Sequence, residues 1–464
     1  MSSPPVDLSR PRRVHLVGVG GAGMSGIARM LIQRGHQVSG SDRQESRALE
    51  ALRAMGAQIR VGHAAAAVSG AEVVVTSSAI GPDNIELVAA RHGGIRVLHR
   101  SEMLASLMAG SRTICITGTH GKTTTTSMVV VALQAAGRDP SFAIGGALNE
   151  TGSNAHAASG DLFVAEADES DRSFLVYTPD VAVVTNVELD HPDVFDDLAD
   201  TERAFGEFLA RRPADAPAVI CLDDPGGARL VQAGGEVVTY GEDPRADVRL
   251  ITDGDAGDAV QSGRLRHHGT DLATVALQTP GRHNLLNATA ALTACWLLDV
   301  DLADATAGLA SFTGPLRRFQ RLGTVDGVEV VDDYAHHPTE LRATLAAARS
   351  VAAGRVVLVV QPHRFSRTAR LGDELGRAAA GADLVVVTDV YGAEEEPVPG
   401  VSGEIVADAA REAGAHVIWE PHLGGVAPRL ANLVSPGDLV VVTGAGDVTE
   451  VGAALLALLR DGET

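Results

Sequence analysis

The chain has 464 residues, 45% of them hydrophobic, and at roughly 150 residues per domain this length predicts about three domains. Its formal net charge of −21 at pH 7 argues against a nucleic-acid or anionic-membrane partner, because no stripe of Lys and Arg is present to offset the repulsion. The sequence also shows no apolar leader and no run of 18 apolar residues. We therefore expect no membrane insertion and a cytoplasmic location.

The first block, residues 1–110, alternates short β-branched runs with helical stretches, which is the pattern of βα units on a parallel sheet. We expect strands at 14–20, 36–42, 73–77 and 95–98, and a helix at 23–34. This arrangement predicts a Rossmann-like, doubly wound α/β domain.

A glycine loop, GVGGAG (18–23), lies between the first expected strand and helix of this block. It satisfies GxGxxG, and Asp42 follows Gly23 by 19 residues, at the end of the second expected strand. On spacing alone this is a dinucleotide fingerprint. The loop indicates only a diphosphate on a helix N-terminus, however, so a nicotinamide cofactor and a nucleotide-sugar diphosphate both fit.

The second block, residues 111–321, repeats the strand, glycine, helix pattern. We expect strands at 113–118, 162–168 and 181–187, and helices at 121–136 and 283–299. Residues 223–275 are rich in Gly and Asp, and we interpret them as an inserted loop or small antiparallel section rather than core. The block predicts a P-loop-type ATPase domain with a parallel sheet.

The third block, residues 322–464, predicts another Rossmann-like, doubly wound domain. We expect strands at 327–335, 355–362, 384–390 and 439–447, and a final helix at 448–460. The three cysteines of the chain, Cys115, Cys221 and Cys295, stand far apart in apolar runs, which indicates buried reduced thiols rather than disulfides or a metal site.

A phosphate-binding loop is indicated by ITGTHGKTT (116–124), although Ile116 stands where GxxxxGK[ST] has its first glycine. In such loops backbone N–H groups and a helix N-terminus face the phosphates, a lysine reaches the β- and γ-phosphates and a Thr hydroxyl binds Mg²⁺. We expect the phosphates of ATP at Gly118, Thr119, His120, Gly121, Lys122, Thr123 and Thr124.

Lys122 is the only lysine in the chain. An ammonium on an unbranched stem can pass between backbone amides, whereas a guanidinium is wider and planar. We therefore infer that the loop wraps closely around this side chain and excludes arginine.

Acidic residues follow the next two expected strands. VAEADESD places Glu166 and Asp168 on the same side of a strand end, and NVELDH ends in Asp190 and His191. Mg²⁺ prefers hard oxygen ligands, and open α/β sheets bind ligands at this carboxyl edge. We expect Mg²⁺ carboxylates in the first group, and a metal or γ-phosphate contact at His191.

Ten motifs in order carry a family resemblance: GVGGAGMSGIA, TSSAI, GTHGKTTTT, EADESDRSF, NVELDH, GRHNLLNATAA, RRFQ, DDYAHHPTE, QPHRFSRT and GAGD. Together they closely resemble the Mur ligases over nearly the whole chain. Within that family the chain is similar to the members that join L-alanine to UDP-N-acetylmuramate.

The resemblance implies a UDP-sugar-binding domain, a central ATPase and a C-terminal domain that closes over the site with the amino acid. It implies ATP-driven amide formation through an acyl phosphate, in peptidoglycan precursor synthesis, with two Mg²⁺ ions. The first ion is assigned to Thr123 and Glu166, the second to His191, and the catalytic residues are Lys122, Glu166 and His191.

Other site residues also come from the resemblance. The glycine loop resembles a UDP-pyrophosphate site rather than an NAD site. The implied UDP-sugar contacts are Gly18, Gly20, Gly21, Ala22, Gly23, Met24, Asp42, His63, Ser77 and Ser78. The implied nucleotide contacts are Asn284, Asn287, Arg318, Asp333 and Tyr334. The implied amino-acid contacts are His336, Arg364 and Arg367.

The chain departs from the family pattern at Ala335, where Gly is commoner, and at Phe195, where Tyr is usual. Several related ligases bind a second Mg²⁺ through a carbamylated lysine, which a chain with one lysine cannot supply.

The alternative functions are a sibling ligase that attaches a recycled tripeptide, an NAD-dependent dehydrogenase fused to an NTPase, and a nucleotide-gated binding module. We expect a monomer or a homodimer.

Overall fold

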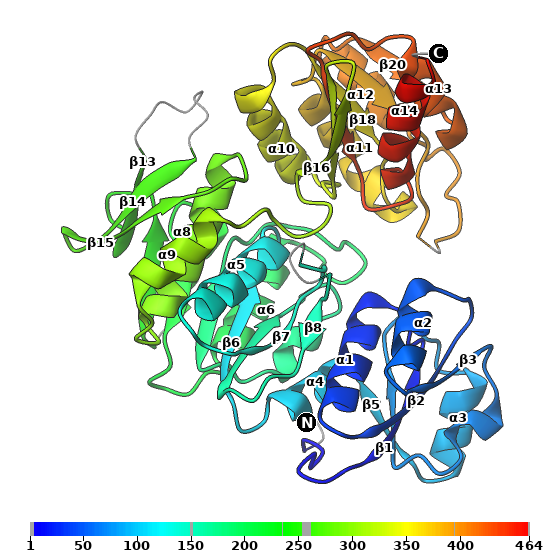
Figure 1. Ribbon diagram of the computed structural model, residues 1–464, viewed down its shortest axis with the longest axis vertical. Helices are drawn as coiled ribbons and strands as arrows, with labels where there is room; N and C mark the ends of the chain where they lie inside the picture. The colour runs from blue at the N-terminus through cyan, green and yellow to red at the C-terminus, as the bar shows by residue number, and fades with distance from the viewer. Residues whose placement is uncertain (1–3, 149–151, 234, 253–260, 394, 463–464) are drawn as a thin grey trace.

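The computed structural model describes residues 4–148, 152–233, 235–252, 261–393 and 395–462. These residues form three α/β units, each built on its own sheet (Figure 1). The N-terminal unit (blue) and the C-terminal unit (yellow to red) both adjoin the central unit. The three-unit, parallel-sheet architecture predicted from the sequence is therefore confirmed. Among the described residues, no helix has the length and apolar character needed to cross a bilayer.

The N-terminal unit is a five-stranded parallel sheet with the strand order β3-β2-β1-β4-β5. Its elements are β1 (Arg13–Val17), α1 (Ala22–Gln33), β2 (Gln37–Asp42), α2 (Arg47–Ala54), β3 (Gln58–Val61), η1 (Ala65–Val68), β4 (Val73–Thr76), α3 (Ile85–His92), β5 (Arg96–His99) and α4 (Arg100–Met108). The strand order reverses between β1 and β4, so the loops that follow these strands diverge and leave a crevice. The glycine loop follows β1 and Ser77 follows β4, at this crevice.

The central unit carries a ten-stranded sheet with the order β15-β14-β13-β12-β11-β10-β6-β9-β7-β8. Its elements are β6 (Arg112–Thr117), α5 (Lys122–Ala135), β7 (Ser141–Ala143), β8 (Ala155–His156), β9 (Leu162–Glu166), η2 (Ser173–Val176), β10 (Val181–Val184), α6 (Leu198–Leu209), β11 (Ala218–Cys221), α7 (Pro225–Leu230), η3 (Val231–Ala233), β12 (Val237–Gly241), β13 (Val248–Thr252), β14 (Ser262–His267), β15 (Thr270–Ala276), α8 (Arg282–Trp296) and α9 (Leu302–Ala310). Helices α5, α8 and α9 pack on one face of this sheet.

The small antiparallel section expected within residues 223–275 is present as β13, β14 and β15, but the interpretation that these residues lie outside the core is wrong for the part that the structure describes. Strands β12 and β13 extend the central sheet in parallel, and β14 and β15 extend it antiparallel. Tyr240, Val248, Leu265 and Val275 are buried in the same hydrophobic cluster as α5 and α8. Strands β13 and β14 bury alternate residues and β15 buries only Val275, so they lack the continuous apolar runs of the central strands. Residues 253–260 lie outside the described part.

The C-terminal unit has the strand order β16-β17-β21-β18-β19-β20, parallel except for β16. Its elements are β16 (Gln320–Val325), β17 (Val328–Asp333), α10 (Pro338–Val351), β18 (Val356–Val360), α11 (Phe365–Ala379), β19 (Leu384–Val387), α12 (Glu404–Glu412), β20 (Val417–Trp419), α13 (Leu423–Ala431), β21 (Leu439–Thr443) and α14 (Thr449–Asp461). The division expected between residues 321 and 322 falls within β16. The divisions at 110/111 and 321/322 remain predictions.

The site-bearing loops follow strands that are almost wholly buried. The phosphate loop follows β6, the acidic segment follows β9, and His191 follows β10, which pairs with β6. Valine and isoleucine fill these strands because helices cover both faces of a parallel sheet. The three cysteines are buried and unpaired, as expected.

Candidate active site

The phosphate loop depends on two glycines with positive φ, Gly118 at 137° and Gly121 at 77°. A Cβ on Gly118 would lie 1.9 Å from Oγ1 of Thr185, and a Cβ on Gly121 would lie 2.7 Å from Oδ1 of Asn287. The loop therefore packs tightly against β10 and α8, and α5 starts directly after it at Lys122. This geometry points a helix N-terminus at the space above the loop, where an anion is stabilised.

Lys122 is enclosed by its own loop. Its Nζ donates to the backbone oxygens of Gly118 at 2.6 Å and Thr119 at 3.1 Å, and it lies 2.9 Å from the buried carboxylate of Glu169. Burial lowers the pKa of Lys122, but Glu169 and the neighbouring carboxylates outweigh burial and leave the pKa raised. The ammonium is therefore charged at neutral pH. The close fit agrees with the inference that arginine is excluded.

The acidic segment after β9 gathers around Lys122. Oγ1 of Thr123 donates to Oε1 of Glu166 at 3.0 Å, and the N–H of Gly145 donates to Oε2 at 2.6 Å. Burial raises the pKa of Glu166, and burial raises the pKa of Glu169 to about 7 despite the nearby ammonium. A further cation would stabilise these carboxylates, and hard oxygen donors are the ligands that Mg²⁺ prefers. Thr123 and Glu166 thus fit the predicted ion.

His191 lies near this group without joining it directly. Its Nε2 is 3.6 Å from Asp190 and 4.0 Å from Glu169. Burial lowers the pKa of His191, so the ring is neutral at pH 7. Its unprotonated nitrogen can then accept a hydrogen bond or bind a metal ion. Its backbone is left-handed, with φ of 53°, a conformation that is uncommon in non-glycine residues and whose instances cluster at functional sites.

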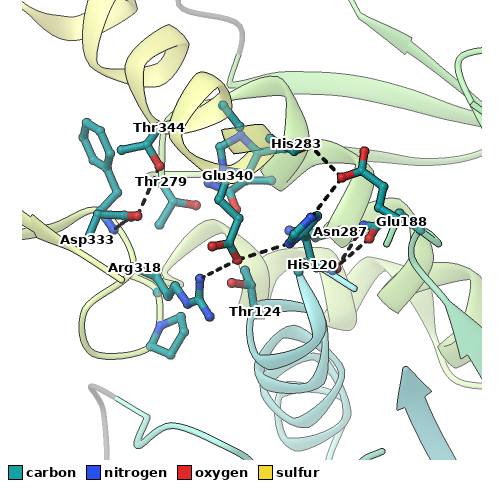
Figure 2. Close-up of a pocket in the computed structure, with 18 of the residues that line it drawn as sticks. His120, Thr124, Glu188, Thr279, His283, Asn287, Arg318, Asp333, Glu340 and Thr344 are labelled. Carbon is teal, nitrogen blue, oxygen red and sulfur yellow. Dashed lines mark hydrogen bonds and ion pairs between the residues drawn. The ribbon is translucent and has the colours of Figure 1, made fainter. Parts of the chain in front are cut away.

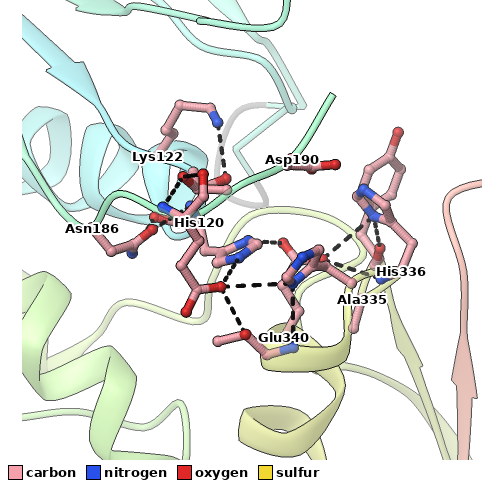
Figure 3. A network of polar contacts seen from close by, with 12 residues as sticks. His120, Lys122, Asn186, Asp190, Ala335, His336 and Glu340 are labelled. Carbon is pink, nitrogen blue, oxygen red and sulfur yellow. Dashed lines mark hydrogen bonds and ion pairs between the residues drawn. The ribbon is translucent and has the colours of Figure 1, made fainter. Parts of the chain in front are cut away.

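A polar network joins the phosphate loop to α10 of the C-terminal unit (Figure 3). Nε2 of His120 lies 3.2 Å from Glu188, and its Nδ1 lies 3.3 Å from Glu340. Burial lowers the pKa of His120, but the two carboxylates raise it to about 9. His120 is therefore an imidazolium between two carboxylates from different units. Glu188 and Glu340 lie in two of the ten motifs, but sequence reasoning gave them no role.

The nitrogens and oxygens of His120, Glu188 and His337 lie within 4.8 Å of one another, which is a spacing that a metal ion can bridge. Nδ1 of His337 accepts a hydrogen bond from the N–H of Thr339 and caps α10, so its lone pair is not available to a metal ion. Because His120 carries a proton on each ring nitrogen at neutral pH, this group is better described as an ion-pair cluster than as a metal centre.

The His120 cluster predicts a pH dependence of stability. A folded-state pKa of about 9, against 6.5 for the ordinary side chain, stabilises the fold by up to about 3 kcal/mol. Because this pKa is raised, the stabilisation is complete below pH 6.5 and is lost as pH rises through about 9. We expect the melting temperature to fall between pH 6.5 and 9, and His120→Gln to flatten that part of the profile. Equal slopes for both proteins would contradict the assignment.

A cavity of about 210 Å³ lies beside the phosphate loop, between the central and C-terminal units (Figure 2). The predicted nucleotide residues that line it are His120, Gly121, Thr124, Asn284, Asn287, Arg318 and Asp333. The predicted residues Gly118, Thr119, Lys122, Thr123 and Tyr334 are not among its lining residues. Sequence reasoning missed Thr279 and Glu340, which also line it.

The polar groups of this cavity are preorganised. The Asp333 carboxylate accepts from the N–H groups of Phe319 and Ala335 and from Thr344, so it is satisfied before any ligand arrives. The guanidinium of Arg318 lies 3.6 Å from Glu340 and 5.1 Å from the ring centroid of Tyr334.

A second cavity, of about 530 Å³, lies over the glycine loop of the N-terminal unit. Every residue predicted to contact the UDP-sugar lines it: Gly18, Gly20, Gly21, Ala22, Gly23, Met24, Asp42, His63, Ser77 and Ser78. Asp42 accepts from the N–H of Gly20 at 2.8 Å, so its carboxylate fixes the loop.

A third cavity, of about 210 Å³, shares Gly23 and Arg100 with the glycine-loop cavity and is also lined by Glu166 and Asp168. Arg100 lies 3.3 Å from Asp168 and from Asp171. The third cavity therefore leads from the glycine loop to the acidic edge, the strand end beside Lys122 where Glu166 and Asp168 lie.

The residues predicted to bind the amino acid lie where the C-terminal unit meets the central unit. Arg367 forms a buried bidentate pair with Asp190, with N–O distances of 2.9 to 3.1 Å. Arg364 is more exposed and pairs with Asp193 at 3.0 Å. Burial lowers the pKa of His336 to about 4, so its ring is neutral at pH 7.

The two departures from the family pattern have local explanations. Ala335 is not one of the residues with positive φ, so alanine costs no backbone strain, and its N–H donates to Asp333. Phe195 is buried, with the Arg172 guanidinium 4.8 Å from its ring centroid.

Comparison with known proteins adds the following similarities. Residues 13–112 match the Mur ligase family, catalytic domain, residues 116–295 the Mur ligase middle domain, and residues 317–446 the Mur ligase, glutamate ligase domain. The chain is 49% identical to a UDP-N-acetylmuramate--L-alanine ligase of Rhodococcus jostii over 99% of this chain and 98% of that protein. It is 50% identical to one of Acidothermus cellulolyticus over 98% and 97%.

Among solved structures, the UDP-N-acetylmuramate-alanine ligase of Thermotoga maritima is similar with a TM-score of 0.80 and 28% identity, covering 97% of this chain and 100% of that one. A murein peptide ligase of Psychrobacter arcticus has a TM-score of 0.71 at 24% identity, covering 97% and 98%, and shows the shared fold alone.

Proposed function

The chain belongs to the Mur ligase family, and we propose that it joins the lactyl carboxylate of UDP-N-acetylmuramate to the amine of L-alanine, with conversion of ATP to ADP and phosphate. The observation that carries the proposal is the set of three cavities around the glycine loop, the phosphate loop and the acidic residues between them. The 530 Å³ cavity lies over the glycine loop, which is suited to a diphosphate, and one 210 Å³ cavity lies beside the phosphate loop. The other 210 Å³ cavity leads from the glycine loop to Glu166 and Asp168. The reaction belongs to peptidoglycan precursor synthesis and takes place in the cytoplasm, the location expected for this family.

The substrate carboxylate reaches the γ-phosphate through the third cavity. Its oxygen attacks phosphorus, ADP leaves, and an acyl phosphate forms. Two anions meet in this step, and Lys122 supplies fixed positive charge where negative charge develops. Mg²⁺ held by Thr123 and Glu166 supplies further charge neutralisation at the phosphates when bound, and His191 is placed to hold a second ion.

In the second step, the alanine amine attacks the acyl carbonyl, the amine loses a proton and inorganic phosphate leaves. We place the alanine beside His336, Arg364 and Arg367, because these side chains lie where the C-terminal unit covers the acidic edge. Guanidinium groups bind carboxylates well, and closure of this unit excludes water that would hydrolyse the acyl phosphate.

A coupled ADP-release assay tests the proposal. We expect release only when UDP-N-acetylmuramate and L-alanine are both present, with the amide product seen by mass spectrometry. The recycled tripeptide replaces L-alanine in a second reaction, and preferred turnover with it would assign the chain to the sibling ligase. A thermal shift with NAD but none with the UDP-sugar would favour a dehydrogenase, and ADP release independent of both substrates would indicate a binding module.

A further inference from the structure

Glu86 is a wholly buried acid that none of the proposed steps uses. It stands in the first turn of α3, where the helix dipole favours negative charge, and its side chain faces β1 and β2. Oε2 accepts from Oγ of Ser41 at 2.5 Å and lies 3.2 Å from Nε2 of His15, and Oε1 accepts from the N–H of Ala64 at 3.0 Å. Burial raises the pKa of Glu86, but these hydrogen bonds outweigh burial and lower the pKa to about 2.

The contacts of Glu86 lead to His63, which lines the glycine-loop cavity, whereas Glu86 itself does not. Nδ1 of His63 lies 3.0 Å from Oγ of Ser41 and 3.5 Å from Oε2 of Glu86. Ala64, whose N–H bonds to Glu86, is the next residue in the chain. The Glu86 carboxylate therefore fixes the backbone next to His63 through Ala64, and it fixes the His63 ring through Ser41.

The direction of these hydrogen bonds follows from the charge of Glu86. An ionised carboxylate only accepts, so the single hydroxyl hydrogen of Ser41 goes to Glu86. The Ser41 oxygen can then only accept from His63, which must carry its proton on Nδ1. In the neutral ring the opposite nitrogen, Nε2, is left bare and directed away from Glu86.

We infer that Glu86 is a positioning residue for nucleotide-sugar binding, acting through Ser41 to fix the orientation and tautomer of His63. The inference rests on the proposed function, because it takes the glycine-loop cavity as the UDP-sugar site. A bare Nε2 is a hydrogen-bond acceptor, so it selects a donor on the uridine, either the uracil N3–H or a ribose hydroxyl.

The test replaces Glu86 by glutamine, which keeps the shape and the acceptor for Ala64. The new amide can donate to Ser41, which frees the Ser41 hydrogen for Nδ1 of His63 and permits the opposite tautomer. We expect the Kd for UDP, measured by calorimetry, to rise about 10-fold, the usual lower range for loss of such a supporting partner. The Kd for ATP should not change. Nitrogen-15 shifts of the His63 ring should show Nδ1 protonated in the parent protein and a loss of that preference in Glu86→Gln.

A double-mutant cycle with His63→Ala separates positioning from a structural role. In the His63→Ala background, Glu86→Gln should have no further effect on the Kd for UDP, and additive effects would overturn the inference. Glu50→Gln, an exposed change in the same unit, is the matched control. If Glu86→Gln does not fold, Ser41→Ala tests the same connection with Glu86 still charged. A parent protein that does not bind UDP would refute the proposed function instead.

Discussion

Replacement of Lys122 by arginine is expected to lower kcat for ligation about 10³-fold, the upper range for loss of one preorganised charge at a transition state. The Lys122 ammonium lies 2.6 and 3.1 Å from two backbone oxygens of its own loop, which leaves no room for a planar guanidinium. Initial rates of ADP release and amide formation measure the effect. The Kd for UDP should stay unchanged, because the glycine-loop cavity belongs to another unit.

The matched control is Arg138→Lys, the reverse exchange at an exposed position just after α5. It should turn over normally, which shows that an Arg/Lys exchange does not by itself disturb the central unit. Turnover of Lys122→Arg within a few-fold of the parent protein would refute the packing argument.

The second large effect is expected at Arg367. Removing one partner of a buried ion pair costs about 3–5 kcal/mol, because the other charge stays buried and unpaired. In Arg367→Ala the Asp190 carboxylate loses the guanidinium that joins it to the C-terminal unit, so the contact between the two units is weakened. We therefore expect kcat to fall at least 10²-fold, with an increase in the radius of gyration in small-angle scattering.

Arg364→Ala is the comparison, because Arg364 is more exposed and pairs with a half-exposed Asp193. We expect it to raise the KM for L-alanine about 10-fold with little change in the KM for ATP or in the radius of gyration. If Arg367→Ala instead raised the KM for L-alanine alone and left the protein compact, the role of the Arg367–Asp190 pair in holding the two units together would be refuted, and amino-acid binding would be the whole role of Arg367.

The order of strands, glycines and helices could be predicted from sequence because each signal is local. Gly118 and Gly121 mark the backbone positions that need positive φ, and the valine-rich runs mark strands buried on both faces. The antiparallel section of residues 223–275 was expected, but its place in the core was missed because strands at the edge of the sheet bury few side chains and carry a weaker pattern.

By itself, the sequence determined which chemical groups stand at each strand end: the lone lysine, the acids after β9 and the glycine loop after β1. Only the tertiary structure decided their partners. Arg367 meets Asp190 across 177 positions of sequence, and His120 becomes an imidazolium only because Glu340 approaches from another unit. Glu86 likewise gains its role from a strand and a loop that lie far from it in the chain. Periodicity and propensity describe neighbours along the chain, whereas charge, tautomer and pKa depend on which surfaces meet when the units pack.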